Sequence, residues 1–278
     1  MLVMKSRAML VWAVMSVCSV FWAEVAHAAD ARMAERFDFQ GREVVMYAPH
    51  KLPAWGQRAL LVVLHGGMGN ADGVRQSLQM DGMADKYGFL IAYLNGNATR
   101  VNAKMKTWNA GECCGLAQHD KVDDVGYIAA AIHEIEQKYG VKSDRVYGMG
   151  HSNGAMMTQR VMCETGIYQA AVPVSGPLEL SVATCPAARG KRVLAIHGAE
   201  DKNVPIAGGR GSKGISNVSF RAEAQTQRVY EKSGAQYKLW VVPGADHKPK
   251  DIEAAIAQSG LVMQEEVVKF LGIAKTDR

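Results

Sequence analysis

Gly150-His151-Ser152-Asn153-Gly154 is the most informative segment of this chain. A strand-like run at 145–149 precedes this pentapeptide, and a helix-like run at 155–162 follows it. A G-x-S-x-G pattern between a strand and a helix predicts a nucleophile elbow, a turn so sharp that the serine must adopt a strained backbone conformation. Such a turn presents the serine hydroxyl at a helix N-terminus, where backbone N–H groups can receive developing negative charge.

The first 28 residues have the organisation of a secretory signal peptide. Lys5 and Arg7 supply a basic start, an apolar run covers 8–22, and small residues at 26 and 28 offer a cleavage site. The apolar run is short for a membrane span, which needs about 20 residues. We therefore expect a secreted or periplasmic protein, with no stable membrane insertion after cleavage and a mature chain of residues 29–278.

The rest of the chain fits one exported domain. An α/β chain of this length commonly forms a single domain. The formal net charge of +5 is mild and has no block of like charge, so we expect no nucleic-acid partner.

Four cysteines remain in the mature chain: Cys113, Cys114, Cys163 and Cys185. An even number in an exported protein favours two disulfides over a metal site or free thiols. Adjacent residues rarely reach good disulfide geometry, so a bond between Cys113 and Cys114 is the least favoured of the three pairings. We expect each of these two to reach a distant partner, and the sequence leaves open which one.

Short apolar runs alternate with helical patterns along the chain. Strands are expected at 44–47, 60–64, 89–93, 146–149, 171–174, 193–196 and 239–242. Few polar residues interrupt these runs, which indicates a sheet covered on both faces. Helices are expected at 125–139, 154–163, 221–232 and 251–271, the first capped by Asp123 or Asp124. The alternation predicts an α/β fold, with a mostly parallel sheet flanked by helices.

Two stretches lack a regular period. Residues 95–116 read as a long cross-linked loop, and residues 208–217 read as a mobile surface loop. The glycines at 209, 211 and 214 match G-x-G-x-x-G, but no strand directly precedes them and no helix directly follows. We therefore expect a flexible loop there rather than a dinucleotide site.

Two later residues complete a candidate site around Ser152. A serine hydroxyl needs a base to take its proton, and the base needs an acid to orient it. In an α/β-hydrolase the acid and then the histidine follow the serine, on loops after later strands. Asp201 follows the expected strand at 193–196, and His247 follows the one at 239–242. We expect Ser152, Asp201 and His247 to form a catalytic triad.

Neighbouring residues compete for these roles. Glu200 or Asp246 could replace Asp201, although the carboxylate of Asp246 cannot easily reach the ring of the adjacent histidine. His65 and His197 each precede a glycine at a strand end, where we expect the imidazole to brace a loop. His151, beside the nucleophile, is a candidate for the wall of the substrate pocket.

An oxyanion hole needs two N–H donors. We expect one from Asn153, directly after the nucleophile, and the other from Gly67 in the loop after an early strand, with Met68 as the alternative. The competing interpretation of that loop is a tight glycine turn without a catalytic role.

Two further features remain open. Trp108 could stack on a substrate group or anchor the cysteine loop, and the sequence supports both roles equally. Asp123 and Asp124, with His119 and Asp120 nearby, are better explained by helix capping and loop hydrogen bonds than by a cation. We expect no metal and no cofactor, because serine chemistry needs neither.

Several segments together resemble the exported poly(3-hydroxybutyrate) depolymerase and feruloyl esterase family, which overlaps the first carbohydrate esterase family. They are residues 108–115, 122–125, 150–154, 185–186 and 197–201. The resemblance covers essentially the whole mature chain, and the tryptophan–double-cysteine segment is its most specific part. It implies an α/β-hydrolase fold, a triad of Ser152, Asp201 and His247, and structural disulfides.

The chain departs from that family at two points. It ends soon after the hydrolase core, without an additional substrate-binding module, which favours soluble esters or oligomers as substrates. The histidine loop reads Asp246-His247-Lys248-Pro249 and lacks the Ser-Trp that often follows this histidine.

These observations predict a serine carboxylic-ester hydrolase acting on short hydroxyalkanoate, hydroxycinnamoyl or acetyl esters. An acyltransferase or a serine peptidase with the same triad is the alternative. A catalytically silent binding protein is less favoured, because such a protein has no need of all three residues.

Overall fold

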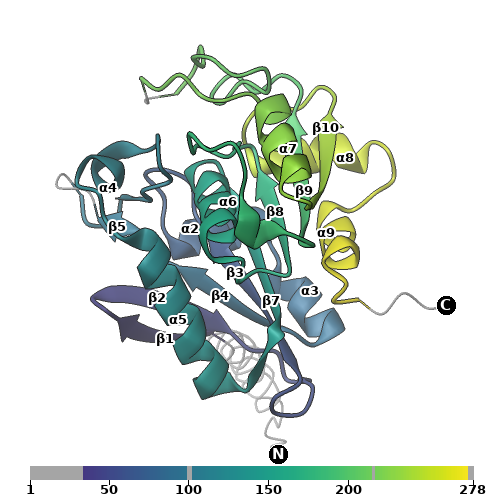
Figure 1. Ribbon diagram of the computed structural model, residues 1–278. Helices are drawn as coiled ribbons and strands as arrows, with labels where there is room; N and C mark the ends of the chain where they lie inside the picture. The colour runs from purple at the N-terminus through teal and green to yellow at the C-terminus, as the bar shows by residue number, and fades with distance from the viewer. Residues whose placement is uncertain (1–33, 99–101, 215–216, 275–278) are drawn as a thin grey trace, which may run out of the picture.

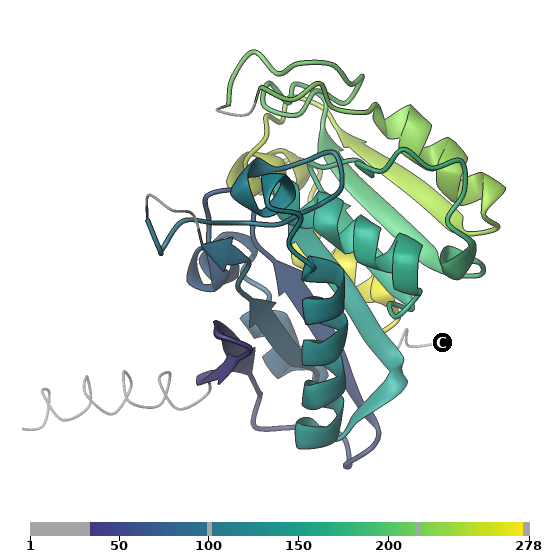
Figure 2. The same ribbon diagram turned by 60° about the vertical axis from the view of Figure 1, so that its left-hand side comes forward.

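The computed structural model describes residues 34–98, 102–214 and 217–274 (Figure 1). The expected signal peptide at 1–28 lies outside these residues. One eight-stranded sheet runs through the centre of the molecule, and helices cover both of its faces (Figures 1 and 2). No helix in the described residues is long and apolar enough to cross a membrane.

The strands follow the spatial order β1-β2-β4-β3-β7-β8-β9-β10. β2 pairs antiparallel with β1 and with β4, and the remaining neighbours are parallel. The bounds are β1 (Ala34–Phe39), β2 (Arg42–Tyr47), β3 (Arg58–Leu64), β4 (Leu90–Leu94), β7 (Val141–His151), β8 (Ala170–Val174), β9 (Arg192–Gly198) and β10 (Gln236–Val242). The expected mostly parallel sheet is confirmed. β1 was not expected, because it is an edge strand with little buried apolar surface.

Helices lie on the two faces of the sheet. α5 (Asp124–Tyr139), α6 (Asn153–Thr165) and α7 (Glu223–Lys232) pack on one face. The opposite face carries α2 (Ala71–Leu78), α3 (Asp81–Tyr87), α8 (Pro249–Ala257) and α9 (Met263–Leu271). The single helix expected at 251–271 is wrong: the chain breaks between α8 and α9, where Gly260 adopts a positive φ of 75° that does not continue a helix.

The stretch at 95–116, expected to be irregular, contains short regular pieces. β5 (Asn97–Ala98) and β6 (Lys106–Thr107) form a small antiparallel pair, and α4 (Gly115–His119) begins at its end. These elements are too short to leave a periodic pattern in the sequence.

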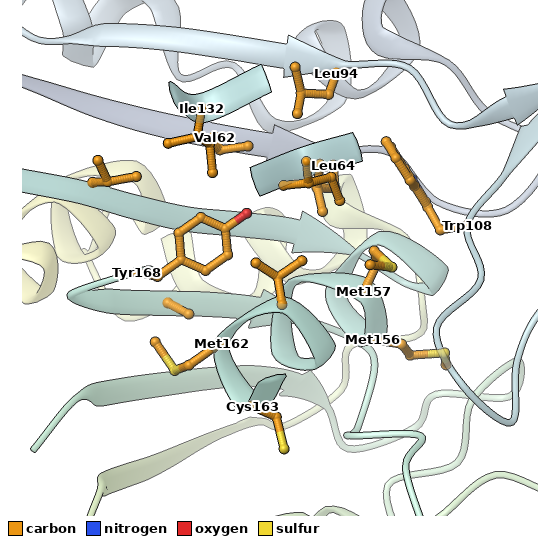
Figure 3. Packing of buried hydrophobic residues seen from close by; sticks show 14 of the residues in the cluster. Val62, Leu64, Leu94, Trp108, Ile132, Met156, Met157, Met162, Cys163 and Tyr168 are labelled. Carbon is orange, nitrogen blue, oxygen red and sulfur yellow. The ribbon is translucent and has the colours of Figure 1, made fainter. Parts of the chain in front are cut away.

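Successive residues of a strand pack alternately into two separate hydrophobic clusters, one on each face of the sheet. Val62 and Leu64 of β3 join one cluster with the helices α5, α6 and α7, whereas Leu61 and Val63 join the other. Figure 3 shows members of the first cluster, among them Met157 and Met162 of α6. Each fully buried side chain of this kind contributes roughly 1.5–3 kcal/mol, so the strand positions are held firmly on both faces.

The two aspartates at the start of α5 have different roles. Asp123 is the N-cap, and its side chain accepts a hydrogen bond of 2.9 Å from the Gly126 N–H. Asp124 is fully buried, pairs with Arg42 at 2.6 Å and accepts from the Asn109 N–H at 2.7 Å. Asp124 therefore ties the start of α5 to the loop that carries Trp108.

The disulfides differ from the expected pairing. Cys163, near the end of α6, is bonded to Cys185, and Cys113 is bonded to Cys114. The expectation that each adjacent cysteine reaches a distant partner is wrong. Cys185 directly precedes the short helix η1 (Pro186–Ala188), which packs on α6, so Cys163 and Cys185 lie opposite one another with Cα atoms 4.6 Å apart. The adjacent pair is thereby left to bond within its own turn.

Candidate active site

Ser152 lies in the tight turn between β7 and α6. Its backbone has φ 56° and ψ −123°, the strained conformation expected of an elbow serine. A Cβ atom at Gly150 would collide with the Gly154 carbonyl, and one at Gly154 would collide with the Leu64 carbonyl. Both glycines are therefore required for the turn and for its close packing against β3.

The structure brings Ser152, Asp201 and His247 together. The His247 Nε2 lies 3.0 Å from the Ser152 Oγ, and its Nδ1 lies 2.7 Å from the Asp201 Oδ2. β9 and β10 are parallel neighbours, so the loops after them, which carry Asp201 and His247, leave the sheet at the same edge. Asp201 and His247 are both buried.

Asp246, the alternative acid, is placed differently. Its Oδ1 accepts from the Lys202 N–H and from the His247 main-chain N–H, both at 2.9 Å, and its Oδ2 lies 3.3 Å from the Lys213 ammonium. Asp246 thus stabilises the backbone of the loop that carries His247, while the ring of His247 contacts Asp201.

Asp201 is held as a carboxylate. Its Oδ1 accepts from the N–H groups of Asn203 and Val204, at 2.9 and 2.8 Å. Burial opposes ionisation, but hydrogen bonds from His197 and His247 outweigh burial and hold the pKa of Asp201 well below its usual range. The acid is therefore charged at neutral pH.

The glycine loop after β3 lies against the elbow. A Cβ built on Gly66 would sit 3.3 Å from the Ser152 Cβ, and one on Gly67 would sit 3.7 Å from the Asn153 Cβ. The next residue, Met68, has a positive φ of 64°. Gly67, Met68 and Asn153, which carry the expected oxyanion donors, thus line the same cavity as Ser152.

Trp108 is a buried residue that holds the glycine loop and the elbow together. Its side chain has no exposed surface, and its Nε1 donates to the His65 carbonyl at 3.0 Å. Its main-chain N–H and carbonyl bond the Asn153 side-chain amide, at 2.8 and 3.0 Å. The expectation that Trp108 could stack on a substrate group is wrong, because its side chain has no exposed surface to offer a substrate.

His151 supports the histidine loop. Its Nε2 donates to the His247 carbonyl at 2.9 Å, and the two rings lie 4.9 Å apart. Burial, followed by the adjacent His247, lowers the pKa of His151 to about 3, so this imidazole is neutral. His151 also lines the cavity above Ser152, where the sequence placed it.

A cavity of about 750 Å³ opens above the serine. Apolar side chains that line it include those of Val74, Val204, Val218 and Phe220. Lys248 is the charged residue among the described lining residues, apart from the histidines, and no carboxylate lines the cavity in that part of the chain. The site is thus a mostly apolar pocket with a small number of polar groups, Ser152 and His247 among them, as expected for small-molecule binding.

Known proteins share this architecture. Residues 51–236 match the phospholipase/carboxylesterase family. Feruloyl esterase B of Neurospora crassa is 33% identical over 132 residues, which cover 47% of this chain and 42% of that protein. The bifunctional acetylxylan esterase/xylanase XynS20E of Neocallimastix patriciarum is 26% identical over 162 residues, covering 58% of this chain and 22% of that protein. The chain therefore spans less than half the length of these curated relatives.

Solved structures agree on the fold. An acetyl xylan esterase from Aspergillus awamori superposes with a TM-score of 0.59 at 16% identity, over 87% of this chain and 99% of that one. The expected fold is confirmed, and the chain belongs to the phospholipase/carboxylesterase family of α/β-hydrolases.

Proposed function

We propose that this protein hydrolyses carboxylic esters through an acyl-enzyme formed on Ser152. The observation that carries the proposal is the unbroken contact from Ser152 Oγ through His247 to Asp201, at the floor of an apolar cavity. Relatives named as a feruloyl esterase and an acetylxylan esterase support the ester as the bond that is cleaved.

In the first half-reaction the Ser152 oxygen attacks the ester carbonyl while His247 Nε2 takes its proton. Asp201 stabilises the imidazolium that forms. The main-chain N–H groups of Asn153 and Gly67, with Met68 as the alternative to Gly67, stabilise the negative carbonyl oxygen. His247 then gives its proton to the leaving alcohol. In the second half-reaction, water activated by the same imidazole releases the acid.

The cavity suits esters of small or medium size. Its volume lies within the range of small-molecule sites, and its apolar walls suit a short hydroxyalkanoate, a hydroxycinnamoyl or an acetyl group. We include oligomers of hydroxybutyrate among the substrates on the strength of the sequence resemblance. A signal peptide at 1–28 would deliver the enzyme to the periplasm or the medium.

The decisive experiment compares the wild type with Ser152→Ala on a short-chain p-nitrophenyl ester. We expect kcat to fall by at least about 10⁴-fold, because the nucleophile is lost. Ser143→Ala, on an exposed part of β7, is the matched control and should keep wild-type activity. Equal rates for Ser152→Ala and the wild type would overturn the mechanism, and no turnover of any ester would favour a silent binding protein.

Two further assays refine the reaction. Measuring free acid against transfer to an added alcohol separates a hydrolase from an acyltransferase, and a matched amide substrate tests for peptidase activity. A panel of hydroxybutyrate oligomers, methyl ferulate and acetylated xylose then ranks the acyl groups by kcat/KM.

A further inference from the structure

A second imidazole touches the carboxylate that orients His247. His197, at the end of β9, has no exposed surface, and its Nε2 lies 3.3 Å from the Asp201 Oδ2. This is the same oxygen that accepts the His247 Nδ1–H at 2.7 Å. Asp201 is therefore shared between two histidines.

Both ring nitrogens of His197 face hydrogen-bond acceptors. The Nδ1 lies 2.8 Å from the Glu223 Oε1, and the Nε2 lies 2.8 Å from the Val204 carbonyl. A neutral imidazole has one donor and one acceptor nitrogen and cannot satisfy two acceptors, whereas an imidazolium donates from both. With Glu223 as a carboxylate acceptor, an imidazolium with a proton on each ring nitrogen satisfies both contacts of His197.

Glu223 supplies the balancing charge. This buried residue of α7 accepts the Tyr237 hydroxyl at 2.6 Å on the oxygen that does not face His197. Its two carboxylate oxygens thus face the Tyr237 hydroxyl and the His197 Nδ1. Burial would lower the pKa of His197, but hydrogen bonds with Asp201 and Glu223 outweigh burial and raise it to about 10.

We propose that His197 is a permanently charged positioning residue, held by Glu223, that draws part of the negative charge of Asp201 away from His247. The proposal rests on the proposed function, because it assigns His247 as the base. Glu223, His197 and Asp201 carry alternating charges, and His247 extends the alternation when it takes the serine proton. Because Asp201 then attracts the protonated ring of His247 less strongly, His247 releases its proton at lower pH. The enzyme therefore keeps a free base in mildly acidic solution.

The other groups around His247 do not supply this effect. His151 is neutral and contacts the main-chain carbonyl of His247. Asp246 accepts the main-chain N–H of His247 and is paired with Lys213. Lys248 is the next residue, and its side chain is exposed to solvent. His197 is thus the cation in direct contact with the orienting carboxylate.

The test is His197→Gln, which keeps an amide donor and removes the charge. We expect the acid limb of the kcat/KM profile to move up by about one pH unit. On that limb kcat/KM falls about tenfold, while on the alkaline side it stays close to the wild-type value. Glu223→Gln should move the limb in the same direction. An unmoved limb, or an equal loss at every pH, would show that His197 has only a structural role and would overturn the proposal.

His133→Gln, on the exposed face of α5, is the matched control and should leave the limb in place. Nitrogen NMR of the labelled, substrate-free protein gives a readout independent of turnover. We expect two protonated ring nitrogens on His197 at pH 8 and a His247 titration that moves to higher pH in His197→Gln. A single protonated nitrogen on His197, or an unmoved His247 titration, contradicts the proposal even if the protein hydrolyses no ester. Absence of ester turnover, by contrast, contradicts the proposed function alone.

Discussion

The carboxyl ends of β3 and β9 carry the same dipeptide in two different states. His65-Gly66 directly follows β3 and His197-Gly198 forms the end of β9, and both imidazoles are buried. The His65 Nδ1 donates to the Gly66 carbonyl at 2.7 Å, while its Nε2 accepts from the Gly96 N–H at 3.0 Å. One donor and one acceptor describe a neutral ring, and burial lowers the pKa of His65 to about 4.

The difference lies in what packs against each ring. Among the residues that the structure describes, main-chain groups alone hydrogen-bond the ring of His65, so burial penalises a charge there and no carboxylate offsets the penalty. His197 meets carboxylates from α7 and from the loop after β9, and these raise its pKa to about 10. His65, after β3, is therefore a neutral residue that supports the glycine loop. His197, at the end of β9, is a charged residue that contacts Asp201. Burial alone does not decide the protonation of a histidine, and its partners do.

The largest expected effect comes from a substitution of Asp201, in the loop after β9. Asp201→Asn should lower kcat by roughly 10⁴-fold, because an amide cannot hold His247 in the required tautomer or stabilise its charged form. Steady-state kinetics on a p-nitrophenyl ester measures the loss. Glu200→Gln, at the exposed neighbouring carboxylate, is the control and should stay near wild type. A large loss in the control and a small one in Asp201→Asn would reverse the assignment of the acid.

An intermediate effect concerns stability against pH. The pKa of His65 is about 4 in the folded protein against 6.5 in the unfolded chain, so the unfolded chain binds more protons between these values. Stability is therefore fully present above pH 6.5 and falls as the pH drops towards 4, by up to about 3 kcal/mol. Urea unfolding of wild type and His65→Gln between pH 4 and 7 measures this, and the variant should lose that part of the slope. Equal slopes would contradict a neutral His65.

His197 should show the opposite sign. Its folded pKa of about 10 lies above the unfolded value of 6.5, so its contribution is fully present below pH 6.5 and is lost as the pH rises through 10. The stability difference between wild type and His197→Gln should therefore shrink from pH 6.5 to 10 in urea unfolding. A difference that grows with pH would contradict the charged state.

The smallest expected effect comes from Trp108, which donates a hydrogen bond to the His65 carbonyl after β3. Trp108→Phe keeps an aromatic ring but removes the donor to the His65 carbonyl, and we expect a loss of about 1–2 kcal/mol in the free energy of unfolding. Trp55→Phe is the control, because Trp55 is 63% exposed and should change stability little. If both variants unfolded at the same urea concentration, the bond to His65 would not stabilise the loop.

Much of the fold was predictable because strong local patterns specify it. The buried strands are unbroken apolar runs, and Ser152 lies in a turn that only its flanking glycines permit. The edge strand β1 and the break at Gly260 were missed, since an edge strand buries little surface and one glycine barely alters a helical period. The disulfide pairing was missed because it depends on how η1 docks on α6.

The amino-acid sequence is sufficient to predict the parallel α/β sheet, the elbow, and the order of serine, acid and histidine along the chain. These follow from periodicity and from chain order, which are local or one-dimensional properties. The folded chain is needed to establish that Trp108 is buried, that Asp201 and not Asp246 contacts the ring of His247, and that two identical His-Gly dipeptides differ in charge. Those outcomes depend on groups far apart in the sequence, as when α7 brings Glu223 to His197.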